Sequence, residues 1–287
     1  MLLENDLENY ISERDLDKNH EANYRRSIRF FGDFLAHPAT RDDLDEPVVN
    51  RWLHFIAQRR KPPTVMGHKR SITAIWNWLY EQHLVRAYDV RRLRRVKIEY
   101  PPPQAWTLTQ TRILLDAAAV LPGRLRCGLD ASQLMTAVVM LGYMSGLRLK
   151  DQRLLKPDDL SGTILSVLQN KTGHPHTIDI GVDATAALMP LIEVGGKHMI
   201  PVAERTLRTW TERLFAIAEA NGFNKRERQG IGTLRKTGAT EVARIGGLEA
   251  AARFLGHKGG TETARRHYVA PEALGQTPTP PSLVSAR

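Results

Sequence analysis

The sequence predicts a mainly α-helical protein of two domains, the second of which carries a small antiparallel β-sheet. Apolar residues recur at three- and four-residue steps through the first hundred residues, which is the spacing of one face of a helix. A basic and proline-rich segment at 91–104 then interrupts the helical pattern. Further on, two short β-prone runs flank the turn-forming residues 170–175, which indicates a hairpin.

The first domain, residues 1–90, is expected to be a helical bundle. Pro47 suits the first turn of a helix, and Pro62 and Pro63 separate that helix from the next. Three apolar stripes at helical spacing define three helices: Tyr24, Ile28, Phe31 and Leu35; Val49, Trp52 and Ile56; Ile72, Ile75, Trp76 and Leu79.

The tryptophans of this domain allow two interpretations. Trp52, Trp76 and Trp78 can stack on nucleic-acid bases, or they can pack in the core of the bundle. Because they lie at helical spacing, we expect them to be core residues.

Residues 91–104 are interpreted as a linker between the domains. Prolines at 101–103 disfavour helix and stiffen the chain. The basic side chains that precede them are Arg91, Arg92, Arg94, Arg95 and Lys97. Such a linker can bind along a polyanion, or it can be a charged spacer with no binding role.

The second domain, residues 105–272, is expected to be mostly helical. Thr107 is a plausible N-cap for its first helix, and a long apolar helix over 131–144 ends at Ser145 and Gly146. Strands are predicted at Thr163–Gln169 and His176–Ile180, and helices at 183–193, 204–221, 233–245 and 248–255. Residues 273–287 are proline-rich and are expected to form a flexible tail.

Charge is distributed unevenly along the chain. The formal net charge is +10, but residues 1–46 carry −6 and residues 47–104 carry +9. A block this basic can neutralise a phosphate backbone, although a solvated face and a charged linker would look the same. The single cysteine, Cys127, excludes an intrachain disulfide and favours a reducing cytoplasmic setting.

Several classes of enzyme site are absent from the sequence. There is no GxxxxGK[ST] loop, no HExxH, no cysteine pair and no GxSxG elbow, which argues against nucleotide hydrolysis, zinc chemistry and esterase chemistry. His174 and His176 lack a third ligand nearby, so we expect them to be exposed turn residues.

What remains is an ordered series of basic residues followed by one late tyrosine. Gly-Leu-Arg-x-x-Asp at 146–151 places Arg148 just after a helix end, with Asp151 three residues further on. Lys171 lies at the tip of the predicted hairpin. The later members are Leu-Arg at 234–235, Leu-Gly-His at 255–257, and Tyr268, with no other tyrosine after Tyr143.

In this order the motifs resemble the tyrosine recombinase, or phage integrase, family. The resemblance covers about residues 5–270. It implies a SAM-like helical core-binding domain that contacts DNA, joined to an α+β catalytic domain. Its implied catalytic residues are Arg148, Lys171, Arg235, His257 and Tyr268, with Asp151 in support; no metal or other cofactor is implied.

The roles follow from phosphate chemistry. Two guanidinium groups, Arg148 and Arg235, match the nonbridging oxygens of a phosphodiester. Tyr268 would attack phosphorus, His257 would donate a hydrogen bond or assist proton transfer, and Lys171 would protonate the leaving 5′ hydroxyl. The alternative is a surface ion pair between Arg148 and Asp151 and a tyrosine that packs in a core.

Two departures from the family pattern stand out. The family has a histidine three residues before its second arginine, where this chain has Gly232. The interval from His257 to Tyr268 is about two residues longer than usual, and the extra length falls at 258–260.

The resemblance also implies partners. We expect double-stranded DNA with a specific recombination site, a homotetramer on DNA, a monomer when free, possible accessory proteins, no membrane, and a cytoplasmic location. Lys69 and Arg70 join the linker's basic residues as candidate DNA contacts. The function would be integration, excision or resolution of a mobile element or replicon. A catalytically weak DNA-binding relative and a type IB topoisomerase-like enzyme are the alternatives.

Overall fold

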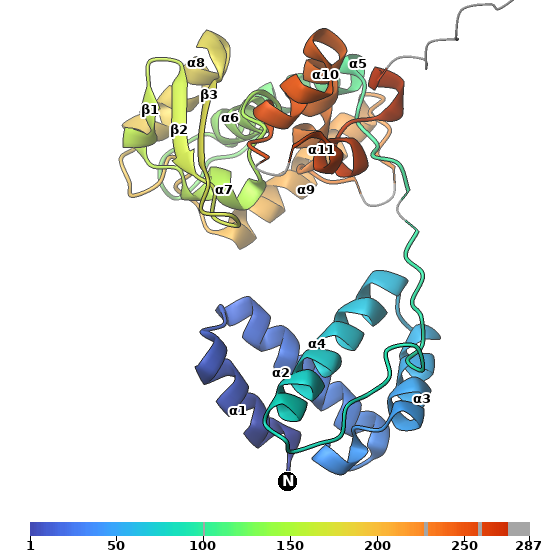
Figure 1. Cartoon of the computed structure of the whole chain (residues 1–287). Coiled ribbons are helices and arrows are strands. Elements are labelled where there is room, and N and C mark those ends of the chain that lie inside the picture. Colours follow the sequence, from blue (N-terminus) through green and yellow to red (C-terminus); the bar gives the residue numbers. More distant parts are fainter. Residues whose placement is uncertain (100, 227–228, 258–259, 275–287) are drawn as a thin grey trace, which may run out of the picture. The chain divides into compact units, whose positions relative to one another are not determined.

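The computed structural model describes residues 1–99, 101–226, 229–257 and 260–274. The chain divides into two compact units, residues 1–100 and 101–287, which are best considered one at a time (Figure 1). The tail predicted at 273–287 falls outside the described residues from position 275 onward. Of the helices in these ranges, none combines the length and apolar character needed to cross a membrane.

The first unit is a bundle of four helices and one short 3₁₀ turn. The elements are α1 (Leu3–Arg14), α2 (Lys18–Leu35), η1 (Arg41–Asp43), α3 (Glu46–Ala57) and α4 (Pro62–Glu81). The three predicted stripes correspond to α2, α3 and α4, and α1 packs against α2 and α4. Asp17 caps α2 by accepting from the amides of Asn19 and His20 at 2.8 and 3.2 Å.

The tryptophans belong to the core of this bundle, as their spacing predicted. Trp52 and Trp76 are 0% exposed and Trp78 is 4% exposed. Each indole N–H is satisfied: Trp52 donates to the carbonyl of Phe30, Trp76 to that of Arg86, and Trp78 to the carboxylate of Glu13. A buried indole needs such a partner.

The second unit is mostly helical, with one small sheet at its edge (Figure 1). Its helices are α5 (Leu108–Ala119), α6 (Ala131–Met144), α7 (Leu149–Leu154), α8 (Gly181–Glu193), α9 (Glu204–Ala220), α10 (Thr233–Phe254) and α11 (Thr261–His267), with 3₁₀ turns η2 (Pro157–Asp159) and η3 (Pro271–Leu274). The apolar α6 is central and packs against α5, α8, α9 and α10 (Figure 1). Thr107 caps α5, as predicted, through a capping box with Gln110.

The sheet has three antiparallel strands in the order β1–β2–β3: β1 (Leu160–Ser161), β2 (Ile164–Leu168) and β3 (Pro175–Asp179). The pairing of β2 with β3 confirms the predicted hairpin, and β1 adds a short edge strand that the sequence did not signal. The mainly α fold with a small antiparallel sheet is therefore confirmed.

Helix α10 bends at Gly247, which has a φ of 75° and breaks the helical geometry. The bend falls between the two helices predicted at 233–245 and 248–255. Gly238, in the first half, allows α10 to approach α6, because a Cβ there would lie 2.2 Å from the carbonyl oxygen of Tyr143. The first half of α10 is thus held close to the end of α6, and the second half turns back toward it.

Candidate active site

The end of α6 and the start of α7 present Arg148. Gly146 has a φ of 61°, and a Cβ at this position would lie 2.6 Å from both the carbonyl oxygen and the ring of Phe254. Only glycine fits this left-handed turn against α10. Arg148 follows as the N-cap of α7, with its side chain partly exposed.

Arg235 lies in the first turn of α10 and is 4% exposed. One of its Nη atoms donates to the carbonyl of Gly146, and the other donates to the carbonyl of Leu255 at 3.2 Å. Arg235 therefore joins the turn that carries Arg148 to the far end of its own helix.

Burial lowers the pKa of Arg235 to about 10; the neighbouring charge of Arg148 also lowers it, whereas Tyr268 and Asp151 act in the opposite direction. The guanidinium is still charged at neutral pH. Its Nε is buried and has no hydrogen-bond partner among the described residues. A buried cation with an unused donor beside a second cation is an environment suited to an anion.

His257 follows α10 and faces Arg235. Arg235 Nη2 lies 3.3 Å from His257 Nε2, and since a guanidinium can only donate, Nε2 is the acceptor. Burial, followed by the charges of Arg235 and Arg148, lowers the pKa of His257 to about 4. The imidazole is therefore neutral at pH 7 and carries its proton on Nδ1. Within the described residues this buried Nδ1 has no hydrogen-bond partner.

Tyr268 is the C-cap of α11, and its ring lies over the same cluster. The guanidinium carbon of Arg235 is 4.7 Å from the centroid of the phenol ring, and the His257 ring centroid is 5.0 Å away. Thr240 of α10 holds the backbone at the tyrosine and just after it: its hydroxyl donates to the carbonyl of Tyr268 at 3.5 Å and accepts from the amide of Ala270 at 3.1 Å. The extra residues between His257 and Tyr268 therefore still bring the tyrosine to the arginine; positions 258–259 themselves lie outside the described residues.

Asp151 lies between Arg148 and the hairpin. One carboxylate oxygen is 3.7 Å from Arg148 Nη1, and the other accepts from the amide of Asn170 at 3.0 Å. Lys171, the next residue, is exposed in the turn between β2 and β3. Its ammonium group makes no hydrogen bond or ion pair with any described residue.

Two buried polar residues near these groups were missed by the sequence analysis. Gln169 is 0% exposed and accepts from Arg148 Nη1 at 3.0 Å. His176 is 6% exposed, so the expectation that it is an exposed turn residue was wrong. Gln169 lies two residues after Val167, which faces inward from β2. His176 lies two residues before Ile178, which faces inward from β3. The period of a strand could therefore have placed them in the interior.

The basic segment 91–97 is fastened to the first unit. Asn50 of α3 holds it by two hydrogen bonds of 2.7 Å, to the carbonyl of Arg92 and from the amide of Arg94. Lys69 of α4 donates to the Arg94 carbonyl at 2.8 Å, and Leu93 is 4% exposed in the core. The charged side chains left exposed are Arg91, Arg92, Arg94, Arg95 and Lys97.

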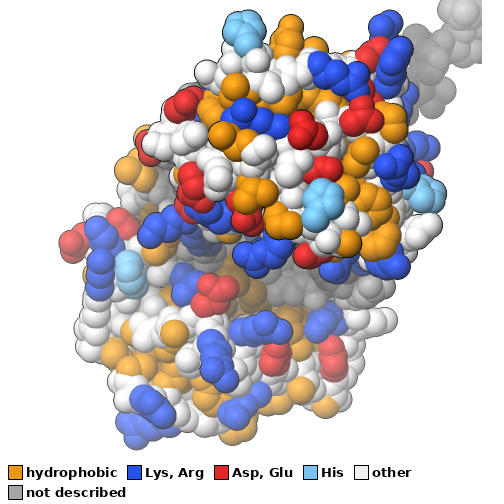
Figure 2. All heavy atoms as spheres, turned by 90° about the horizontal axis from the view of Figure 1, so that it is seen from below, with side chains coloured by type: hydrophobic (Ala, Val, Ile, Leu, Met, Phe, Trp, Pro, Cys, Tyr) orange, Lys and Arg blue, Asp and Glu red, His pale blue; other side chains and the backbone are white. Residues whose placement is uncertain are grey.

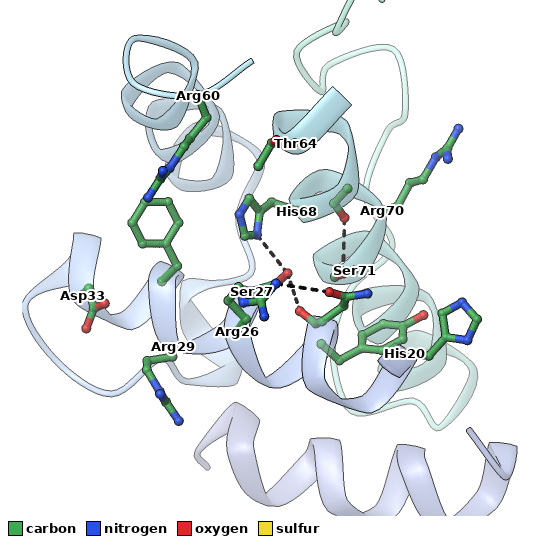
Figure 3. A pocket seen from close by; sticks show the side chains of 14 residues that line it. His20, Arg26, Ser27, Arg29, Asp33, Arg60, Thr64, His68, Arg70 and Ser71 are labelled. Atoms are coloured by element: carbon green, nitrogen blue, oxygen red, sulfur yellow. Dashed lines mark hydrogen bonds between the residues drawn. The ribbon is translucent and has the colours of Figure 1, made fainter. Parts of the chain in front are cut away.

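The first unit has a groove of about 810 Å³ between α2 and α4. Its arginines, all exposed, are Arg26, Arg29, Arg60 and Arg70. Figure 3 shows Arg26 and Arg29 on the α2 side and Arg60 and Arg70 on the other. Only Arg70 had been predicted as a contact.

His68 lies at the centre of this groove beside Ser27 (Figure 3). The Ser27 hydroxyl donates to the carbonyl of Asn23 at 2.8 Å, so it must accept the 2.9 Å hydrogen bond from His68 Nδ1. Burial, and then the charges of Arg26 and Arg60, lowers the pKa of His68. His68 is therefore neutral at pH 7, with Nε2 as an acceptor.

The face of the molecule in Figure 2 carries basic side chains interspersed with acidic ones. The net charge of +10 therefore does not form a single-sign field over that face. The local groove and the fastened basic segment are more informative about binding than the total.

No family model matches the chain, and no curated protein matches its sequence. Solved structures do match. A lambda integrase (75–356) dimer bound to a COC′ core site superposes with a TM-score of 0.72 at 19% identity, over 90% of this chain and 92% of that one. The Tn1549 transposon integrase with a circular intermediate DNA gives 0.73 at 15% identity, over 93% and 95%. A lambda integrase tetramer bound to a Holliday junction gives 0.72 at 18% identity, over 93% and 77%.

The chain has the tyrosine recombinase fold. Gly232, where the sequence resemblance leads one to expect a histidine, is the N-cap of α10. Among the described residues, no atom lies within 4 Å of a Cβ built at this position, so these residues leave room for a side chain.

Proposed function

We propose that this chain is a site-specific recombinase that cleaves DNA through a covalent 3′-phosphotyrosine at Tyr268. The observation that carries the proposal is the position of Tyr268 over Arg235, 4.7 Å from guanidinium carbon to ring centroid. A tyrosine, two arginines and a histidine from separate segments converge there, and the phenol ring also packs against an apolar cluster that includes Leu255 and Val269. The alternative, an ion pair between Arg148 and Asp151 with a tyrosine that merely packs in a core, gives no use to the buried Nε of Arg235, which has no partner among the described residues.

The cluster has the electrostatic character of a phosphate site. Two guanidinium groups repel each other, and Asp151, 3.7 Å from Arg148, offsets only part of their charge. A phosphodiester supplies the missing negative charge and matches guanidinium geometry. Donors fixed before the substrate arrives stabilise the charge that develops on the nonbridging oxygens in the transition state.

The chemical step is balanced without a cofactor. The Tyr268 oxygen releases its proton to solvent and bonds to phosphorus, while the bond from phosphorus to the 5′ oxygen breaks. The 5′ oxygen takes a proton, for which we propose Lys171 as donor, since its ammonium group is exposed and unpaired among the described residues. His257 would donate from Nδ1 to a nonbridging oxygen. Attack by a 5′ hydroxyl of another strand reverses the sequence and joins the new partner.

DNA binding is proposed for two surfaces of the first unit. The groove between α2 and α4 offers four exposed arginines for phosphates and the acceptor Nε2 of His68 for a base amino group. The segment 91–97 offers further cations on a backbone that is already fixed by Asn50 and Lys69. The similarity to integrases solved as a dimer and as a tetramer on DNA supports assembly into a tetramer on two sites. We propose a monomer in the absence of DNA.

The test uses nicked suicide DNA selected from fragments of the host replicon. Wild-type protein is expected to give a covalent protein–DNA product, and Tyr268→Phe is expected to bind the same DNA without forming that product. A covalent product that persists in Tyr268→Phe would refute the assignment of the nucleophile.

A catalytically weak DNA-binding relative is the second candidate, and Gly232 is the observation that favours it. Specific retention of DNA with no covalent product would support it. Because the Cβ position of Gly232 is open, Gly232→His is expected to fold and to raise the rate of covalent product formation if a phosphate contact is missing. Relaxation of any supercoiled plasmid, without a specific site, would instead identify a type IB topoisomerase-like enzyme.

A further inference from the structure

We propose that Gln169 is a positioning residue that holds Arg148, Arg235 and the Lys171 turn in one fixed arrangement. This inference rests on the proposed function, because the arrangement matters only if these groups act on one phosphate. Gln169 directly follows β2 and is 0% exposed, so its amide must find its partners inside the protein.

The oxygen end of the amide contacts the first arginine. Arg148 Nη1 donates to Gln169 Oε1 at 3.0 Å. Because a guanidinium has no acceptor, this contact fixes which end of the amide is the oxygen. The same Nη1 is 3.7 Å from Asp151, so the hydrogen bond to the glutamine is the shorter of its two restraints.

The nitrogen end reaches the second arginine through one carbonyl. Gln169 Nε2 donates to the carbonyl of Leu255 at 3.0 Å, and Arg235 Nη2 donates to that same oxygen at 3.2 Å. One carbonyl at the end of α10 is therefore shared by the glutamine and the buried arginine. A Cβ at Gly256, which has a φ of 62°, would lie 2.2 Å from Gln169 Nε2. The glycine of the Leu-Gly-His motif thus makes room for this amide.

The backbone of Gln169 closes the turn that carries the lysine. Its amide donates to the carbonyl of His174 at 3.0 Å, and its carbonyl accepts from Thr172 and Gly173 at 3.2 and 2.8 Å. Lys171 lies inside this turn. A single residue therefore connects the proposed proton donor, by main chain, with both arginines, by side chain.

The contacts require an amide and not merely a residue of this size. A glutamate retains the acceptor for Arg148 but places a carboxylate oxygen against the carbonyl of Leu255. A methionine has similar length and provides neither a strong acceptor nor a donor. These two substitutions therefore remove one or both halves of the connection with little change in volume.

The experiment compares Gln169→Met and Gln169→Glu with Gln152→Met in the full-length protein. Gln152 is a matched control, because it is 4% exposed and its side chain donates to the carbonyl of Leu147 at 3.0 Å. Its contact with Arg148 is a main-chain one, from its amide to the Arg148 carbonyl at 2.9 Å, and the substitution leaves that contact in place. Single-turnover cleavage of suicide DNA is expected to fall on the order of 100-fold in Gln169→Met, as for a misplacement of about 1 Å. Gln169→Glu is expected to be intermediate. DNA affinity should change less than about threefold, because the phosphate contacts of the first unit are unaltered.

A second substrate separates positioning from general damage. A methylphosphonate at the cleavage position removes the charge of one nonbridging oxygen, so exact placement of the guanidinium groups should matter less. On this DNA, the ratio of the wild-type cleavage rate to the Gln169→Met cleavage rate is expected to be at least tenfold smaller, on the order of the loss of one charged contact. A merely structural role would slow both substrates equally.

Two results would overturn the inference: equal losses in Gln169→Met and Gln152→Met, or an undiminished loss on methylphosphonate DNA. If wild-type protein forms no covalent product, the proposed function fails by itself. The positioning role is then decided by nitrogen NMR of the guanidinium groups. Slow rotation of the Arg148 Nη groups that persists in Gln169→Met would reject it, and faster rotation in that variant alone would support it.

Discussion

The two units use arginine in opposite ways. In the groove of the first unit, Arg26, Arg29, Arg60 and Arg70 are exposed, so each can contact a phosphate only weakly and adjustably. In the second unit Arg235 is 4% exposed and is held by two backbone carbonyls. Under the proposed function, the difference assigns affinity and chemistry to separate units: exposed cations suit binding of a long polyanion, and a buried, fixed cation suits one reacting phosphate.

The largest effect is expected from Arg235→Lys. Lysine keeps the positive charge but has no planar fork, so it cannot hold both carbonyls and a phosphate oxygen. Covalent product formation should fall by about 10²–10³-fold, the typical loss for one preorganised donor. Single-turnover cleavage at saturating DNA checks this. A parallel loss of DNA affinity would contradict the separation of binding from chemistry.

A smaller and different effect is expected in the groove. Removing one phosphate contact, as in Arg26→Ala, should lower the slope of log affinity against log salt by about one unit. The cleavage rate at saturating DNA should be unchanged. Affinity titrations at several salt concentrations check this, with Glu81→Gln, an exposed residue outside the groove, as control. A change in the cleavage rate at saturating DNA would contradict the assignment of binding to the first unit and chemistry to the second.

A pH effect is expected from His257. Its folded pKa, about 4, lies below the ordinary value near 6.5, so the unfolded chain binds the proton more readily. The free energy of unfolding should therefore be constant above about pH 6.5 and fall as pH decreases toward 4. His176, whose pKa burial also lowers, acts in the same direction.

Urea unfolding between pH 7 and pH 4.5 measures this dependence. His257→Asn should reduce the pH dependence, whereas His20→Asn, at an exposed position of the first unit, should leave it as in wild type. An unchanged pH dependence in His257→Asn would show that the imidazole is not held neutral by its surroundings.

The smallest effect is expected from Asn50→Ala. Loss of its two hydrogen bonds to the basic segment should cost the first unit about 1–2 kcal/mol and loosen the backbone near Arg92 and Arg94. Limited trypsin digestion should cut this segment several-fold faster. Unaltered digestion would mean that Leu93 and Lys69 hold the segment without Asn50.

The sequence predicted the fold class because its patterns are local. Helical spacing identified α2, α3 and α4, Thr107 marked the start of α5, and residues 170–175 marked the hairpin. Helices α7 and α11 were missed because they span only Leu149–Leu154 and Thr261–His267, too short for a periodic pattern to emerge.

The site was predicted less completely, because its contacts join distant segments. Arg148, Arg235, His257 and Tyr268 were chosen by resemblance, and the structure brings them together. The connection through Gln169 depends on the backbone carbonyl at position 255. Every residue has such a carbonyl, so the sequence does not show which one accepts this hydrogen bond. The interpretation of residues 91–104 as a linker likewise had no way to include the hydrogen bonds from Asn50.

The hydroxyl of Thr240 binds the carbonyl of Tyr268 and the amide of Ala270, so the tyrosine is held by the same helix that carries Arg235. Under the proposed function, the nucleophile and the buried arginine therefore belong to one polypeptide. Mixing a protomer that carries Tyr268→Phe with one that carries Arg235→Lys is then expected to restore no cleavage.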